Sequence, residues 1–157
     1  MGNRSKGVLA IALLFVMVSV EGCSSPKNDE EEHSYDLSSY GISVDGIVVL
    51  EFGSKLCSYC RAQVNELKKI HDEFGDKVEI FTVLIGPRDD PDAYKKDNGL
   101  EWRVKTDSDL WNKVREDFGA RGIPTTLILK DGNVACHWIG LIRSGDLKQK
   151  IEDLLGD

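Results

Sequence analysis

The chain has 157 residues, of which 20 are Lys or Arg, 27 are Asp or Glu and 41% are hydrophobic. This length suits one folded domain, and the ordinary apolar fraction excludes disorder throughout the chain. The net charge of −7 argues against a nucleic-acid-binding surface, which needs clustered basic side chains. The sequence also has no glycine-rich phosphate-binding motif.

The N-terminus has the pattern of an export signal. Arg4 and Lys6 precede an apolar run from residue 8 to residue 20, which Glu21 ends. This run is shorter than the roughly 20 apolar residues that a membrane-spanning helix needs. We therefore predict a secretory signal over residues 1–22, with a short transmembrane anchor or a buried core helix as the alternatives.

Residues 20–23 (Val-Glu-Gly-Cys) resemble the lipobox of prokaryotic lipoproteins, in which the cysteine becomes the lipidated first residue of the mature chain. Cys23 is therefore a candidate lipidation site, although Glu21 stands where a small residue is usual. An unmodified cysteine is the alternative. A lipid on Cys23 would tether the protein to a membrane. Residues 23–39 are acidic and mostly polar, which predicts a flexible linker before a domain at 40–157.

Strands and helices alternate through the predicted domain. Short β-branched apolar runs predict strands, and apolar residues three or four apart predict helices. In chain order we expect a strand at 47–52, a helix from 60 to 74, a strand at 78–85, a short helix at 91–98, a brief strand at 102–105, a helix begun by 107–109 and stopped at Gly119, a strand at 125–130, an antiparallel return at 134–139 and a final helix capped by Ser144. This order predicts an α/β fold with a central mixed sheet and helices on both faces.

A Cys-x-x-Cys pair lies between the first strand and the first helix. The helix N-terminus presents free N–H groups and a positive dipole end, which stabilise a thiolate on Cys57. We expect Cys57 to be the exposed nucleophile and Cys60, one turn into the helix, to be the buried resolving thiol.

The same pair could instead form half of a zinc site or a purely structural disulfide. Tetrahedral zinc needs two more ligands. Cys136 and His137 are adjacent in a predicted strand, so their side chains point to opposite faces and cannot both reach one metal. Cys136 is then left over, either as a small buried hydrophobe or as a regulatory partner thiol.

Three motifs make the chain similar to thioredoxin-fold thiol-disulfide oxidoreductases of the exported TlpA/ResA type. They are residues 50–52 leading to 57–61 (Cys-Ser-Tyr-Cys-Arg), residues 122–126 (Gly-Ile-Pro-Thr-Thr), and residues 129–132 (Leu-Lys-Asp-Gly) followed by Gly140. The resemblance covers about residues 40 to 156. It implies a thioredoxin fold.

The resemblance also implies roles for further residues. Pro124 would follow a cis peptide bond and face the Cys pair, and the backbone of Ile123 would pair with a substrate peptide beside Ser58 and Tyr59. A trans Pro opening a strand is the alternative. Glu51, six residues before Cys57 in an apolar strand, would have a raised pKa and exchange protons with Cys60. A solvated Glu51 at a sheet edge is the alternative.

The implied function is a membrane-tethered thiol-disulfide oxidoreductase on the extracytoplasmic side of the membrane. It would reduce disulfide-containing protein substrates and draw electrons from a membrane thiol donor, with cytochrome c maturation as a frequent task of the family. No organic cofactor or metal is required. Tyr59 resembles the centres of disulfide isomerases, whereas Ile123 points to reductants, so an isomerase or oxidase is an alternative. A Cu(I) metallochaperone is a rival from another class. A peroxide-reducing enzyme is disfavoured, because the lone cysteine after Pro and Thr is absent.

Overall fold

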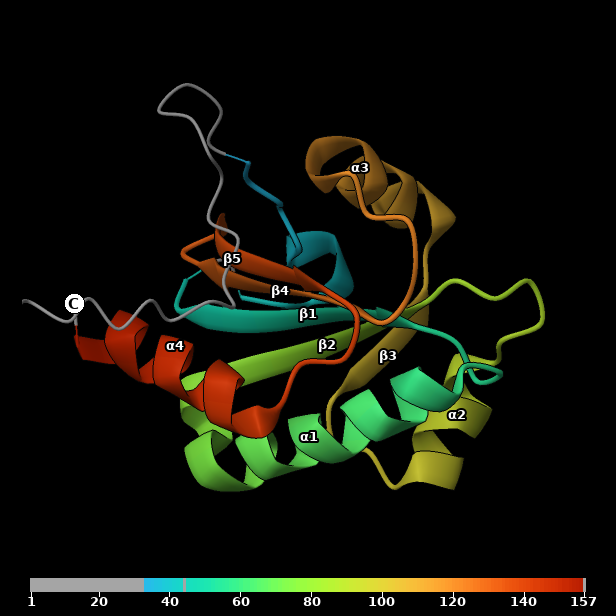
Figure 1. The fold of residues 1–157 in the computed structure, drawn as a ribbon, viewed down its shortest axis with the longest axis horizontal. Coiled ribbons are helices and arrows are strands. Elements are labelled where there is room, and N and C mark those ends of the chain that lie inside the picture. The colour runs from blue at the N-terminus through green and yellow to red at the C-terminus, as the bar shows by residue number, and fades with distance from the viewer. Residues whose placement is uncertain (1–32, 44, 157) are drawn as a thin grey trace, which may run out of the picture.

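The computed structural model describes residues 33–43 and 45–156, which form a five-stranded sheet with helices on both faces (Figure 1). The strands are β1 (Ile47–Gly53), β2 (Val78–Leu84), β3 (Arg103–Thr106), β4 (Thr125–Lys130) and β5 (Asn133–Ile139), in the spatial order β3-β2-β1-β4-β5. The β1–β2 and β2–β3 pairs are parallel, and the β1–β4 and β4–β5 pairs are antiparallel. The predicted mixed α/β sheet is confirmed.

The helices divide between the two faces of the sheet. They are α1 (Ser58–Phe74), α2 (Pro91–Asn98), α3 (Ser108–Phe118) and α4 (Ser144–Gly156). α1, α2 and α4 cover one face and α3 covers the other (Figure 1). β1 is central and buried along its whole length. Its alternate side chains therefore enter two cores, with Ile47 and Val49 on the α1 side and Val48 and Leu50 on the α3 side.

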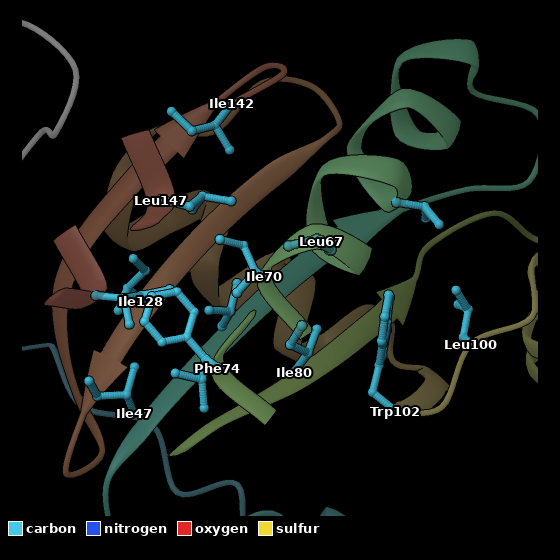
Figure 2. Close-up of a cluster of buried hydrophobic side chains, with 14 of the residues drawn as sticks. Ile47, Leu67, Ile70, Phe74, Ile80, Leu100, Trp102, Ile128, Ile142 and Leu147 are labelled. Atoms are coloured by element: carbon cyan, nitrogen blue, oxygen red, sulfur yellow. The ribbon is translucent and has the colours of Figure 1, made fainter. Parts of the chain in front are cut away.

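The core on the α1 side is the larger cluster, shown in Figure 2. Leu67 and Ile70 of α1 and Leu147 of α4 pack there against Ile80 of β2 and Ile128 of β4. Burying apolar side chains contributes about 25 cal/mol per Å² removed from water, so this cluster anchors α1, and with it the Cys pair, on the sheet.

Local sequence signals account for most helix ends. The Asp90 carboxylate accepts hydrogen bonds from the first backbone N–H groups of α2, and Asp107 accepts one from Leu110 N at 2.7 Å. Gly99 and Gly119 end α2 and α3 in the left-handed conformation that glycine adopts without strain.

The start of α4 differs from the prediction. The helix begins at Ser144, and the group that caps it is the carboxylate of Glu66 in α1, which accepts a hydrogen bond from Ser144 N at 2.8 Å. A cap that comes from another helix leaves no local pattern in the sequence. β3 also begins one residue later than expected, so Trp102 precedes it.

Residues 33–39 pack on the domain, although the prediction placed them in the linker. Tyr35 and Leu37 are buried, Tyr35 N donates to Gly132 O at 2.9 Å, and Val134 N donates to His33 O at 2.9 Å. The domain therefore includes these residues. The predicted signal at 1–22, Cys23 and the rest of the proposed linker lie outside the described residues. Within the part of the chain that the structure describes, none of the helices has the length and apolar character needed to cross a membrane.

Candidate active site

Cys57 and Cys60 form a disulfide at the N-terminus of α1. Their Cα atoms are 5.2 Å apart, within the usual range for a disulfide. Cys57 is the N-cap residue and partly exposed, whereas Cys60 lies in the first turn and is completely buried. Cys60 N donates a hydrogen bond to Cys57 Sγ at 3.1 Å. An attacking sulfur has to be reachable, so this asymmetry favours Cys57 as the one that meets another molecule.

The surroundings of Cys57 suit a negative charge. Its sulfur occupies the capping position, where unpaired N–H groups and the helix dipole favour an anion. The first turn of α1 contains no acidic residue, so no carboxylate there opposes that effect.

The turn before Cys57 is fastened to the segment that follows β2. Cys57 N donates to Ser54 O at 3.1 Å, which closes the turn. The carboxylate of Asp89 accepts hydrogen bonds from Lys55 N at 3.3 Å and from Gly86 N at 2.9 Å. Sequence reasoning missed Asp89, because its two partners lie in separate loops. The sequence offered one indication of Asp89, because it stands directly before Asp90, which caps α2.

The loop before β4 lies against the Cys pair. The Ile123–Pro124 peptide bond is cis, and Cys57 Sγ is 3.8 Å from the carbonyl oxygen of Ile123. Pro124 is buried and Ile123 partly exposed. Gly140 N donates to Pro124 O at 2.8 Å, which ties this loop to the end of β5. The structure therefore brings Cys57, Cys60, Ile123 and Pro124 together.

Exposed apolar side chains flank Cys57. Leu56 is 84% exposed and Tyr59 is 67% exposed, and Ser58 between Cys57 and Tyr59 also faces solvent. Large apolar side chains at this exposure contribute little to folding, so they are available for contact with another molecule.

Glu51 lies in β1 behind the Cys pair and is fully buried. A Cβ atom placed on Gly53 would lie 2.5 Å from Glu51 Oε1 and 3.4 Å from Cys60 Cβ, so the carboxyl group sits beside Cys60. Burial raises the pKa of Glu51 to about 8. Neither carboxyl oxygen makes a hydrogen bond of standard geometry to a described residue. A solvated Glu51 at a sheet edge does not fit this burial.

The buried hydroxyl of Tyr94 in α2 is electrostatically coupled to this acid. Burial first, and then the charges of Glu51 and Asp89, raise the pKa of Tyr94, while Arg61 lowers it. Sequence reasoning did not single out Tyr94, because an aromatic residue in an amphipathic helix usually indicates only core packing.

The other cysteine and histidine candidates lie elsewhere in the fold. Cys136 is completely buried in the cluster on the α1 side, whereas the ring of His137 lies 4.6 Å from Phe118 of α3, so the two side chains do point to opposite faces. No group of three or more His, Cys, Asp or Glu side chains among the described residues could hold a metal ion.

Comparison with known proteins agrees with this geometry. The model of the AhpC/TSA family matches residues 20–137. A thioredoxin of Rhodospirillum rubrum is 27% identical over 111 residues, which cover 71% of this chain and 85% of the relative.

Two solved structures show the same fold. A secreted thiol-disulfide isomerase from Corynebacterium glutamicum has a TM-score of 0.63 at 18% identity, and the match covers 87% of this chain and 100% of that one. The thioredoxin domain of a thiol-disulfide oxidoreductase from Bacteroides vulgatus has a TM-score of 0.60 at 21% identity, and the match covers 74% of this chain and 82% of that one. The chain belongs to the AhpC/TSA family and is a thioredoxin-fold protein thiol-disulfide oxidoreductase.

Proposed function

We propose that this protein reduces disulfide bonds of exported protein substrates, with Cys57 as the nucleophile and Cys60 as the resolving thiol. The observation that carries the proposal is the Cys57–Cys60 disulfide at the start of α1, with one sulfur partly exposed and the other buried. A disulfide that only stabilises the fold does not need this asymmetry, nor the Ile123 backbone beside its outer sulfur.

In the first step, the thiolate of reduced Cys57 attacks one sulfur of a substrate disulfide. A bond forms between Cys57 Sγ and that sulfur, and the other substrate sulfur leaves as a thiolate that takes up a proton from solvent. The backbone of Ile123 holds the substrate segment in an extended conformation, while Leu56, Ser58 and Tyr59 contact its side chains.

In the second step, Cys60 releases the substrate. With a pKa of about 8, Glu51 is ionised in a minority of molecules at pH 7, and in these its carboxylate accepts the proton of the Cys60 thiol. The resulting thiolate attacks Cys57 Sγ. The bond to the substrate breaks, the substrate leaves as a thiolate, and Cys57 and Cys60 become a disulfide. Two electrons have passed to the substrate, so a dithiol donor has to reduce the protein again.

Two cysteine variants test this order of events. Cys60→Ser should accumulate a covalent adduct between Cys57 and a disulfide substrate, visible on a non-reducing gel and released by dithiothreitol. Cys57→Ser should form no such adduct and should lose turnover in the insulin-reduction assay. An adduct through position 60 in Cys57→Ser, or unchanged turnover, would contradict the assignment.

The direction of electron flow is testable by the reduction potential of the Cys pair. A value near the roughly −270 mV of thioredoxin supports the reductant that we propose. A value near about −120 to −180 mV supports an oxidase or isomerase that uses the same two cysteines. The secreted isomerase with the same fold makes this the leading alternative.

Export and tethering rest on the sequence. We propose that residues 1–22 direct export, that a lipid on Cys23 anchors the protein outside the cytoplasm, and that a membrane thiol protein supplies electrons. The secreted isomerase with the same fold supports export. Wild type should be recovered with membranes and Cys23→Ala in the soluble fraction, and equal membrane recovery of both would argue against the anchor.

Cu(I) binding is the rival of a different class, because Cys57 and Cys60 offer two soft ligands when reduced. Titration of the reduced protein with Cu(I) under a competing chelator distinguishes the two. Tight one-to-one binding that is lost in Cys57→Ser would favour a metallochaperone.

A further inference from the structure

Glu51 is flanked by a buried threonine on each neighbouring strand. It stands directly opposite Thr82 of β2 on one side and Thr126 of β4 on the other. All three residues are completely buried. Residues opposite each other in adjacent strands share one face of the sheet. Both hydroxyls therefore lie on the face to which Glu51 directs its carboxyl group, beneath α1.

The two threonines differ in their hydrogen bonds. Trp102 Nε1 donates a buried hydrogen bond to Thr82 Oγ1 at 3.1 Å, whereas Thr126 Oγ1 has no hydrogen-bond partner among the described residues. A threonine hydroxyl carries one hydrogen and can accept from other donors. Because Trp102 occupies the acceptor side of Thr82, the hydroxyl hydrogen is available to a second group.

Trp102 is well fixed as a donor. It is 6% exposed and belongs to the core cluster on the α1 side (Figure 2). Its ring centroid lies 5.7 Å from that of His71 in α1, in an edge-on arrangement. A side chain packed in this way holds its N–H group in one direction, and so it restricts the orientation of the Thr82 hydroxyl.

The acid opposite Thr82 requires such a donor. Both carboxyl oxygens of Glu51 are buried and lack a hydrogen bond of standard geometry within the described residues. Burial is the main influence on the pKa of Glu51 and raises it, and a hydrogen bond from Thr82 acts in the opposite direction. A donated hydrogen bond stabilises the ionised form of a carboxyl group.

We propose that Thr82, oriented by Trp102, is a positioning residue that donates its hydroxyl hydrogen to the ionised carboxylate of Glu51 and keeps it beside Cys60. The proposal deepens the proposed function, because it rests on Glu51 as the base for Cys60. Among the described residues, Cys60 of α1, which titrates only when reduced, lies beside Glu51, and the charge of Glu51 acts on Tyr94 of α2. The charges of Asp89 and Arg61 act in turn on Tyr94.

The test compares Thr82→Val with Thr126→Val as its matched control. Each variant replaces one buried hydroxyl opposite Glu51 by a methyl group of similar volume. The pKa of Glu51 is followed by NMR of its ¹³C-labelled carboxyl carbon in the oxidised protein. We expect Thr82→Val to raise the titration midpoint by about one pH unit, a tenfold change in the ratio of protonated to ionised carboxyl. Thr126→Val should leave the midpoint near that of wild type, and Thr82→Ser, which keeps the hydroxyl, should restore it.

Kinetics separates this proposal from the proposed function. At pH 7 the release of substrate from the Cys57 mixed disulfide should be slower in Thr82→Val, and its pH profile should move to higher pH by the same amount as the NMR midpoint. Equal midpoints in wild type, Thr82→Val and Thr126→Val would overturn the role of Thr82. A moved midpoint with an unmoved kinetic profile would instead leave Thr82 in place and refute Glu51 as the base.

Discussion

The buried carboxyl group of Glu51 predicts a pH-dependent stability that a single substitution should remove. Glu51 is fully buried in β1, and burial raises its pKa to about 8 from the 4.5 of an exposed glutamate. Between pH 4.5 and 8 the unfolded chain releases this proton, while the folded protein retains it. The folded state then binds more protons, so stability has to fall as pH rises through this window. Glu51→Gln stays neutral in both states and lacks this loss.

The expected size follows from the two pKa values. Each pKa unit corresponds to about 1.4 kcal/mol, so the gap between 4.5 and about 8 amounts to about 5 kcal/mol as an upper value. At about pH 5 the wild type and Glu51→Gln should be of similar stability, and at about pH 8 the variant should be more stable by several kcal/mol. The difference in unfolding free energy between the two proteins, plotted against pH, should have a slope that approaches about 1.4 kcal/mol per pH unit.

Urea unfolding of the oxidised proteins at several pH values between about 5 and 8 measures this difference. Histidines and other titrating groups are common to both proteins and cancel in the comparison. A stability difference between wild type and Glu51→Gln that changes by less than about 1 kcal/mol over this range would refute the reasoning.

Glu79→Gln is the matched control, because Glu79 occupies a different environment on the neighbouring strand β2. Its side chain is 35% exposed, and its carboxylate lies 3.8 Å from Arg103 Nε. It pairs with Val48 in the parallel register, on the face of the sheet opposite to Glu51. The pH-dependent difference in stability from wild type depends on burial next to Cys60, so it should appear in Glu51→Gln and not in Glu79→Gln.

Three further predictions concern other contacts. Gln63→Ala should lower the free energy of unfolding by about 2 kcal/mol in urea titrations. The Gln63 side chain accepts a hydrogen bond from Ile142 N at 2.9 Å and donates one to Ile142 O at 3.2 Å, and both backbone groups would lose their partner. A change of less than about 0.5 kcal/mol would contradict this. The hydrogen bond from Ser144 N is the main cause that lowers the pKa of Glu66 to about 2. The ionised Glu66 carboxylate stabilises the fold fully above pH 4.5, and this stabilisation is lost as the pH falls toward 2. Glu66→Gln should therefore reduce the loss of stability between pH 4.5 and 2, as measured by urea unfolding. An unchanged loss over this range would count against the cap. Leu56→Ala should raise KM for a protein substrate with little effect on the unfolding midpoint, since this side chain is 84% exposed; an unchanged KM would remove it from the substrate surface.

Local patterns in the sequence predict much of the fold. The β-branched run at the start of β1 and the Asp-Gly turn before β5 each need only neighbouring residues to be interpreted, and both strands form as predicted. The position of Cys57 and Cys60 at the start of α1 follows from the same kind of evidence, a buried strand, a short break and an amphipathic helix.

The interactions that sequence analysis missed are contacts between distant segments. The carboxylate of Glu66 in α1 caps α4. Tyr35 is buried, and its backbone N–H donates a hydrogen bond to Gly132 O, almost a hundred residues further along the chain. The Trp102–Thr82 hydrogen bond joins residues 20 positions apart in the chain. Trp102 directly precedes β3, and the parallel pairing of β3 with β2 brings its side chain within reach of Thr82. Periodicity shows which face of an element is apolar, but it does not show which polar atom of another element that face meets.

The ionisation of Cys57 in the reduced protein is the most direct test of the account. The rate of iodoacetamide alkylation, measured against pH and located by peptide mass analysis, reports the pKa of the modified thiol. We predict that Cys57 is alkylated first, with a midpoint below the roughly 8.5 of free cysteine, and that buried Cys60 is protected. A midpoint for Cys57 at or above that of free cysteine, or earlier alkylation of Cys60, would contradict it.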